Sequence, residues 1–310
     1  HKLNDEFEKI QDDMKGEIFE EEVLKAEAKA DKQQAKAEKK ARKKAVADTE
    51  EEAKKRIFVL DFDGDTKASD LEDLRHCITA ILSVARAEKD EVMLRLESPG
   101  GMVHAYGLAS SQLTRIRKSK LRLTICVDMV AASGGYMMAC VADHLIAAPF
   151  AYVGSIGVLV QLPNIHRLLK DNKVDFEMVT AGEYKRTLTT FGQNTDKDRQ
   201  KVQEEVDEMH SLFKGFIKEQ RPSVNLDAVA TGEVWTGQQA MGLGLVDALD
   251  TSDEWIAGQL DHADIYAVRW EHKKKITDKL SAMLEGSITG IFNKLVYGWL
   301  HRADKEKYFS

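Results

Sequence analysis

The chain has 310 residues, a formal net charge of −7 and a mean hydropathy of −0.39. The length fits one or two domains, the 43% of hydrophobic residues suffices for a globular core, and the negative charge argues against a nucleic-acid binder. Three cysteines exclude a disulfide framework, and no apolar run approaches the ~18 residues of a membrane-spanning helix. The first residues are charged and no initiator Met precedes them, so we expect a trimmed form that has lost an upstream membrane anchor.

Residues 1–55 have the composition of a charged helical stalk or linker, because they are rich in Ala, Glu and Lys and lack Pro. Four apolar residues follow a short heptad spacing: Leu3, Phe7, Ile10 and Met14. Residues 25–44 hold nine Lys or Arg against three acidic residues, a run that could contact anionic lipid or nucleic acid. A solvated helix or a disordered stalk is the simpler interpretation, and we favour it.

From residue 56 onward, short apolar runs alternate with segments in which apolar residues recur at helical spacing. The predicted strands are 56–62, 92–96, 121–127 and 152–158. The predicted helices are 71–85, about 104–117, one from about 133, 204–219, and a helical hairpin at 226–246 broken by Gly232 and Gly237. Alternation of strands and helices is typical of an α/β fold with right-handed crossovers. We therefore expect an α/β body at residues 56–260.

Residues 261–310 are predicted to form a strand at 265–268 and a final amphipathic helix. The apolar side of this helix consists of Leu280, Met283, Leu284, Ile288, Ile291, Phe292, Leu295, Trp299 and Leu300. Such a helix can lie on a membrane surface or pack against a neighbouring subunit, and the sequence favours neither.

Two glycine-rich turns are candidates for catalytic chemistry. Residues 97–101 follow a predicted strand and read Glu-Ser-Pro-Gly-Gly, in which backbone N–H groups can face a cleft as one half of an oxyanion hole. Such a sequence is often only a turn. Ser133 follows another strand at the start of a helix and is flanked by Ala and Gly, which leave room for a substrate backbone. A capping serine is common at such a position but would not need small neighbours, so Ser133 is the candidate nucleophile.

The remaining candidates are a second serine and two bases. Ser155 lies in a strand with glycines but without a helix start, so it ranks below Ser133. Lys185 reads as an ordinary surface charge, yet a lysine can activate a serine if burial lowers its pKa. Histidine is the commoner base, and His104, just after the Pro-Gly-Gly turn, is the strongest rival to Lys185.

Five motifs occur in one order along about residues 56–260, and together they are more specific than any one alone. They are Ser98-Pro99-Gly100-Gly101, Ala132-Ser133-Gly134-Gly135-Tyr136, Gly154-Ser155-Ile156-Gly157, Tyr184-Lys185 and Thr231–Ala240. In them the chain resembles the signal peptide peptidase A family of serine proteases (peptidase family S49), most closely its SohB branch. The resemblance implies a Clp protease/crotonase-type α/β fold of repeated ββα units, here with helical extensions at both ends.

The same resemblance implies the site. It places the nucleophile on Ser133, the general base on Lys185, and the oxyanion donors on the backbone of Gly134 and of Gly101 rather than Gly100. The expected activity is that of a serine endopeptidase that cleaves small or apolar peptides, such as remnant signal peptides or membrane-protein fragments, without a cofactor or metal. The related Clp protease has a histidine on the strand equivalent to 153–158, where this chain has none, which favours lysine as the base.

The resemblance also implies partners and a location. Family members with a single copy of these motifs form a ring in which the dyad is completed across a subunit boundary, so we expect a homo-oligomer, by resemblance of eight subunits. The family is anchored in the bacterial inner membrane and its protease domain faces the periplasm. The basic run and the unpaired cysteines would suit the cytoplasm equally well, so the side of the membrane stays open.

Two other classes of function remain as alternatives. A crotonase-like acyl-CoA enzyme would use the same fold and two backbone N–H groups, but it would not need the pair of Ser133 and Lys185. A catalytically dead membrane scaffold would use only the helical ends. Reaction of Ser133 with a covalent serine probe would separate these classes from a protease.

Overall fold

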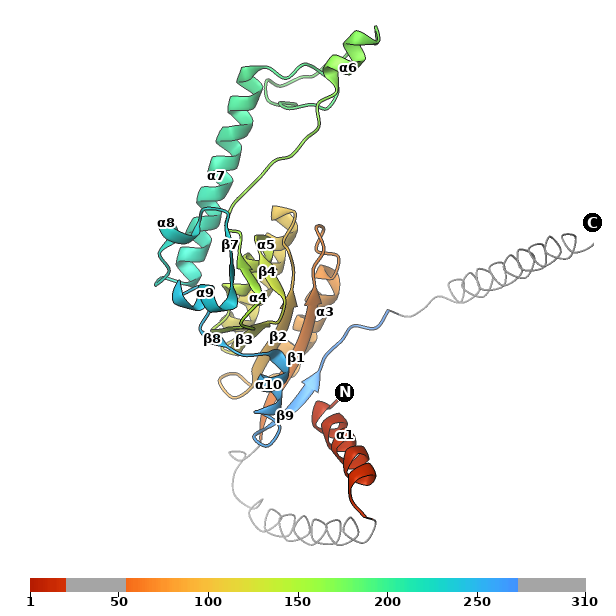
Figure 1. The fold of residues 1–310 in the computed structure, drawn as a ribbon, viewed down its shortest axis with the longest axis vertical. Coiled ribbons are helices and arrows are strands. Elements are labelled where there is room, and N and C mark those ends of the chain that lie inside the picture. Colours follow the sequence, from red (N-terminus) through yellow and green to blue (C-terminus); the bar gives the residue numbers. More distant parts are fainter. Residues whose placement is uncertain (21–53, 273–310) are drawn as a thin grey trace, which may run out of the picture. The chain divides into compact units, whose positions relative to one another are not determined.

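A six-stranded parallel sheet forms the centre of the protein in a computed structural model, which describes residues 1–20 and 54–272. The strand order is β8-β5-β3-β2-β1-β9, and every pairing in this sheet is parallel (Figure 1). The strands are β1 (Lys55–Asp63), β2 (Glu91–Glu97), β3 (Arg122–Val127), β5 (His144–Ala147), β8 (Ala248–Leu249) and β9 (Ala263–Ala267). The protein is therefore an α/β protein, as the sequence predicts.

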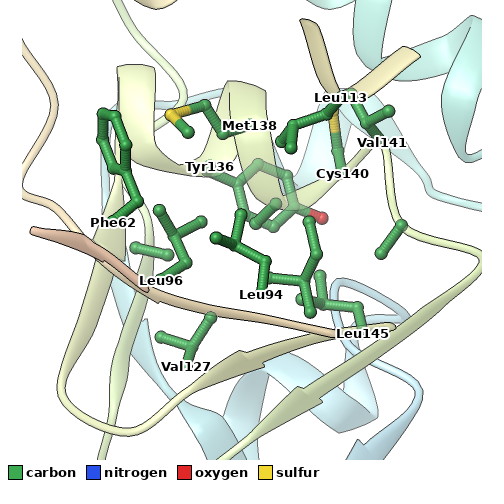
Figure 2. Close-up of a cluster of buried hydrophobic side chains, with 14 of the residues drawn as sticks. Phe62, Leu94, Leu96, Leu113, Val127, Tyr136, Met138, Cys140, Val141 and Leu145 are labelled. Carbon is green, nitrogen blue, oxygen red and sulfur yellow. The ribbon is translucent and has the colours of Figure 1, made fainter. Parts of the chain in front are cut away.

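Helices cover both faces of this sheet. Successive strand residues point to opposite faces, so Phe58 and Leu60 join the larger apolar core, while Ile57 and Val59 join a smaller one. The helices that contribute to the larger core include α3 (Leu71–Val84), α4 (Val103–Lys118) and α5 (Gly134–Ala139). Helices α1 (Leu3–Ile18) and α10 (Ser252–Ala257) contribute to the smaller one. Figure 2 shows the Tyr136 ring of α5 within the larger core, near Leu94 and Leu145.

A second, three-stranded sheet lies beside the carboxyl end of β2. It consists of β4 (Val130–Ala132), β6 (Tyr152–Gly154) and β7 (Val234–Thr236), with β4 parallel to β6 and β6 antiparallel to β7. Ser98, directly after β2, forms a parallel bridge with Ala131 of β4. This bridge places the turn after β2 beside the end of β4.

The segment between β6 and the long helix α7 (Asp196–Gln220) contains one short helix, α6 (His166–Asp171). In Figure 1 the chain leaves β6 in an extended stretch, forms α6 and returns to the sheets along α7. We call residues 157–195 the arm. The C-terminal half of α7 packs against the rest of the protein, because Phe213 and Ile217 are buried in the larger core. Two short helices, α8 (Leu226–Val229) and α9 (Gly237–Gly242), flank β7.

The first residues of the chain attach to the edge strand β9. The amino group of His1 donates to the carbonyl of Ala267 at 3.0 Å, and the Asn4 side chain accepts from the Ile265 N–H at 2.8 Å while it donates to the carbonyls of Leu260 and Ala263. Leu3 is buried in the smaller core. In residues 1–20 and 54–272, no helix has both the length and the apolar character needed to cross a bilayer.

Several predicted elements need correction. The strand predicted at 152–158 ends at Gly154, because Gly154 and Ser155 both have positive φ (111° and 51°) and turn the chain. The helix predicted at 204–219 begins at Asp196, where Thr195 forms a capping box. The predicted hairpin at 226–246 is wrong, since β7 separates its two short helices. Strands β4 and β5 were not predicted, and the basic run at 25–44 and the final helix lie outside the described residues.

Candidate active site

Ser133 occupies a tight turn between β4 and α5. Its backbone has φ 52° and ψ −117°, a conformation that is costly for a residue with a side chain, and its N–H donates to the carbonyl of Gly154 at 2.8 Å. Strand β4 is held on both sides, by β6 and by Ser98, whose carbonyl accepts from the Ala132 N–H at 3.0 Å. The surrounding sheet thus keeps Ser133 in a strained conformation, on a strand-to-helix turn of the kind that exposes a nucleophilic oxygen.

The Pro-Gly-Gly turn lies directly against Ser133. Gly100 has φ +86°, and a Cβ built on it would lie 2.6 Å from the backbone nitrogen of Gly134 and 2.8 Å from Cβ of Ser133. No side chain fits at this distance, so glycine is required for the close approach of the turn. The two motifs that the sequence singled out, at 97–101 and at 131–136, are therefore brought together by the fold.

The N–H groups of this turn differ in their partners. The Gly100 N–H donates to Oγ of Ser98 at 3.1 Å. Within residues 1–20 and 54–272, no acceptor is bonded to the N–H of Gly101 or of Gly134. Both N–H groups are therefore available to donate to a bound oxygen, as the donors of an oxyanion hole must be.

Close packing fixes the position of both glycine motifs. A Cβ on Gly134 would lie 2.5 Å from the ring of Tyr106 in α4, and one on Gly101 would lie 2.1 Å from the carbonyl oxygen of Thr66. The Tyr106 hydroxyl contacts Ser98 Oγ at 2.6 Å and donates to the carbonyl of Asp65 at 2.6 Å. Burial raises the pKa of Tyr106, and the hydrogen bond with Ser98 only partly opposes this, so the phenol stays protonated.

Sequence reasoning missed these contacts of Tyr106. The helical spacing places Tyr106 on the same face as Ala109 and Leu113, where a large side chain reads as ordinary core. The polar partners come from other elements, so no local pattern signals them.

Lys185 lies on the arm, away from the elements that hold Ser133. Its side chain is exposed, and in the described part of the chain its Nζ has no hydrogen-bond or ion-pair partner. The neighbouring Glu183 pairs with Lys197 at the start of α7, and Nζ of Lys197 lies 5.9 Å from the ring of Tyr184. Within the described residues, no hydrogen bond joins Lys185 to Ser133.

The two rivals are placed differently. Ser155 follows β6 with φ 51°, and its N–H donates to the carbonyl of Glu233 at 2.6 Å. It therefore also occupies a strained turn, but it neither opens a helix nor adjoins the Pro-Gly-Gly turn. His104 lies in the first turn of α4 with an exposed side chain.

The arm carries many large apolar side chains that a single chain leaves exposed. They include Leu159, Val160, Leu168, Val174, Val179 and Phe191. Helix α6 has no buried residue. Soluble monomers rarely expose so much apolar surface in one segment, which makes the arm a candidate interaction surface.

Comparisons with known proteins bear on this site. The family model for peptidase family S49 matches residues 115–265, and the model for the S49 N-terminal region matches residues 1–113. A protein of Haemophilus influenzae named "Probable protease SohB" is 51% identical over 245 residues, which are 79% of this chain and 69% of the relative. Its namesake in Buchnera aphidicola subsp. Acyrthosiphon pisum is 48% identical over 244 residues, 79% of this chain and 72% of the relative. A protein of Methanocaldococcus jannaschii named "Putative protease MJ0651" is 31% identical over 173 residues, 54% of this chain and 55% of that protein.

Proposed function

The chain belongs to peptidase family S49 and is a serine-type peptidase, and we propose on this premise that it is an endopeptidase with Ser133 as nucleophile and Lys185 as base. The observation that carries this proposal is the approach of the Pro-Gly-Gly turn to Ser133, which a Cβ on Gly100 would block at 2.6–2.8 Å. The N–H of Gly134 directly follows Ser133 and the N–H of Gly101 directly follows this close contact, which supports both as donors to the oxygen of the reacting carbonyl. A serine hydrolase combines a nucleophilic serine with N–H donors that stabilise the oxyanion of the tetrahedral intermediate.

The base is proposed to come from a second copy of the chain. Oγ of Ser133 and Nζ of Lys185 each lack a hydrogen-bond partner within the described part of one chain, and the arm that carries Lys185 exposes its apolar side chains. If the arm docks on a neighbouring subunit, its apolar surface is buried and Lys185 leaves water. Removal from water favours the neutral amine over the ammonium ion, and only the neutral amine can accept a proton.

The reaction follows from these roles. Nζ of Lys185 takes the proton of Ser133 as Oγ bonds to the peptide carbonyl carbon, and the carbonyl electron pair moves onto oxygen. The oxyanion accepts hydrogen bonds from Gly101 and Gly134. Collapse of this intermediate breaks the C–N bond, and the lysine gives its proton to the leaving amine. Water then attacks the acyl-enzyme with the same lysine as base and frees Ser133.

The finer features of the proposal rest on the family resemblance. They are a Clp protease/crotonase-type version of the α/β fold, a ring of eight subunits, small or apolar peptide substrates, and attachment to the bacterial inner membrane with the protease in the periplasm. The exposed apolar surface of the arm supports the assembly, because a closed ring uses one heterologous interface in every subunit.

A subunit-mixing experiment tests the shared dyad. Ser133→Ala and Lys185→Ala are purified separately, each is shown to be inactive on a quenched fluorescent peptide, and the two are mixed under conditions that allow subunit exchange. A boundary is active only where an intact serine meets an intact lysine. In an equal, random mixture of a cyclic assembly, activity should return to about one quarter of the wild-type value.

Two controls make the result decisive. Lys170→Ala removes another exposed lysine of the arm and should retain wild-type activity. Ser133→Ala mixed with a Ser133→Ala/Lys185→Ala double variant has no intact serine and should stay inactive. If native mass spectrometry shows mixed assemblies of the two single variants and they stay inactive, the shared dyad is refuted.

A further inference from the structure

A chain of three hydrogen bonds, two of them buried, runs from the Pro-Gly-Gly turn through Ser98 and Tyr106 to the loop after β1. The Gly100 N–H contacts Ser98 Oγ at 3.1 Å, Ser98 Oγ contacts the Tyr106 hydroxyl at 2.6 Å, and the Tyr106 hydroxyl contacts the carbonyl oxygen of Asp65 at 2.6 Å. Ser98 and Tyr106 are both 0% exposed. The two hydrogen bonds of Ser98 are therefore shielded from water, whereas the bond from Tyr106 to Asp65 is partly buried and ends on an exposed residue.

The direction of each bond follows from the atoms present. The carbonyl of Asp65 can only accept, so the phenol proton of Tyr106 points to it. The phenol oxygen must then accept the proton of Ser98, and Ser98 Oγ is left with lone pairs for the Gly100 N–H. Each hydroxyl has one proton to donate, so the whole chain has a single direction and fixes the orientation of the Ser98 hydroxyl.

The three hydrogen bonds end at the Asp65 carbonyl, which belongs to a loop that also contacts the Pro-Gly-Gly turn. The loop that supplies the Asp65 carbonyl is itself ordered, because the Asp65 carboxylate accepts from the N–H groups of Lys67 and Ser69 and from the Ser69 hydroxyl. The same loop touches the turn again through Thr66, whose carbonyl accepts from the Met102 N–H at 2.9 Å. The phenol of Tyr106 thus ties the Gly100 peptide, through Ser98, to the hydrogen-bonded loop at residues 65–69.

The ring of Tyr106 supports the other side of the site. It lies so close to Gly134 that a Cβ there would be 2.5 Å from it. The Tyr106 side chain therefore contacts both motifs of the site. Its hydroxyl bonds to Ser98 of the Pro-Gly-Gly turn, and its ring packs against Gly134, the residue after Ser133. The three atoms nearest to a Cβ on Gly134 all belong to Tyr106, whose hydroxyl also hydrogen-bonds with Ser98 in the network of the Pro-Gly-Gly turn.

We propose that Tyr106 is a positioning residue for peptide-bond hydrolysis: through Ser98 and Gly100 it sets the distance between the N–H groups of Gly101 and Gly134. This inference rests on the proposed function of these glycines as the oxyanion hole. Tyr106 does not touch the substrate. Its hydroxyl acts on the turn, and the turn acts on the transition state, in which the oxyanion is most sensitive to the placement of its donors.

The experiment compares two tyrosines that are equally buried. Tyr106→Phe keeps the ring against Gly134 and removes only the hydroxyl. Tyr136→Phe is the matched control, because the Tyr136 hydroxyl is also buried and also donates to a backbone carbonyl, that of Leu245 at 2.9 Å, away from the turn. Measurements are kcat and KM on a quenched fluorescent peptide, the inhibition constant of a peptide aldehyde, and the melting temperature. The aldehyde adds to the serine and places its oxygen in the oxyanion hole.

Tyr106→Phe should lower kcat by about 10-fold to 100-fold, less than the ~10²–10³ for outright loss of a donor. KM should stay within about twofold of wild type, and the aldehyde should bind more weakly in proportion to the loss in kcat, because both depend on the same donors. Both Tyr→Phe variants should lose similar stability, but Tyr136→Phe should keep its kcat. Ser98→Ala breaks the same chain of bonds, so the double variant Ser98→Ala/Tyr106→Phe should lose no more than the worse single variant.

The outcomes separate this inference from the proposed function. If the wild-type protein neither hydrolyses the peptide nor reacts at Ser133 with a fluorophosphonate, the proposed function fails and the inference fails with it. If the wild type is active and Tyr106→Phe matches it in kcat and in aldehyde binding, only the inference is refuted. Equal losses of kcat in Tyr106→Phe and Tyr136→Phe would likewise refute it, since the hydroxyl would then act on stability alone.

Discussion

Replacement of Gly100 by alanine tests the geometry on which the proposed active site depends. The new methyl group would project from the turn toward the backbone of Ala132 and Gly134 and toward the side chain of Ser133. The side chain changes by one methyl group, so the polar and charged groups of the site stay as they are.

The expected size of the effect follows from the distances. The methyl carbon would lie 2.6 Å from two backbone atoms, and an ordinary contact starts at 3.4 Å, so the turn must move by about 0.8 Å. A misplacement of about 1 Å at a reacting centre can cost ~10²-fold in rate. Gly100 also has φ +86°, a region that costs a residue with a Cβ about 1–2 kcal/mol. We therefore expect a loss of about 10²-fold in kcat together with a lowered melting temperature.

The assay needs a glycine control in the same region. Gly107 lies in the interior of α4, and a Cβ built there meets nothing within 4 Å. Gly107→Ala should therefore raise stability by about 0.5–1 kcal/mol and leave kcat unchanged. The two variants are compared with wild type by peptide hydrolysis, by labelling with a fluorophosphonate and by thermal unfolding.

Two outcomes for the Gly100→Ala and Gly107→Ala variants would contradict the proposed role of the Pro-Gly-Gly turn. If Gly100→Ala folds, assembles as the wild type does and keeps a kcat within about threefold of it, the turn does not supply an oxyanion donor. A loss of kcat in Gly107→Ala as large as that in Gly100→Ala would show that the region responds to any added methyl group.

Two further predictions concern Ser155, the rival to Ser133, and Asp90, a buried carboxylate just before β2. Ser155→Ala should retain peptide hydrolysis and labelling by a fluorophosphonate, whereas Ser133→Ala should lose both. The reverse result would make Ser155 the nucleophile. Burial alone would raise the pKa of Asp90, but hydrogen bonds from Arg86 and Arg56 hold it well below its usual range, so Asp90→Asn should cost about 3 kcal/mol at neutral pH. Ionised Asp90 therefore stabilises the folded protein fully at pH values above its unfolded-state pKa of ~3.9. This stabilisation decreases as the pH falls below that value. Denaturant unfolding at pH 7 and pH 3 should therefore show the gap between variant and wild type shrinking at pH 3, and a constant gap would contradict this origin.

The sheet and its first helices could be predicted from sequence because their signals are local. Strands β1, β2 and β3 are buried on both faces, so they read as apolar runs, and α3 and α4 repeat apolar residues at helical spacing. Strand β7 could not be predicted, because three residues between glycines carry no periodicity. The start of α7 was placed too late because its first turns are polar and solvent-exposed, and only the Thr195 capping box marks where it begins.

The candidate site was predicted as a set of residues but not as an arrangement. Ser133 and the Pro-Gly-Gly turn stood out by composition, yet their contact depends on the bridge between Ser98 and Ala131, which joins distant parts of the chain. The support from Tyr106 was invisible, because a tyrosine on the buried face of a helix looks like any other core residue. The exposure of Lys185 agrees with its interpretation as an ordinary surface charge, but its position on a separate arm was not predicted, since helix α6 of the arm buries no residue that would leave a pattern.

The two halves of the proposed dyad are held in very different ways, and this difference has a chemical consequence. Ser133 is fixed by paired strands, by close-packed glycines and by a strained backbone, so its geometry exists before any partner arrives. Lys185 lies on an exposed segment, where within the described residues no hydrogen bond or ion pair orients its Nζ. In the proposed enzyme the interface therefore supplies the base, whereas each chain alone supplies the oxyanion donors. Changes at Gly100 or Tyr106 then act on kcat in every assembled boundary, while changes to the apolar side chains of the arm act on how many boundaries form.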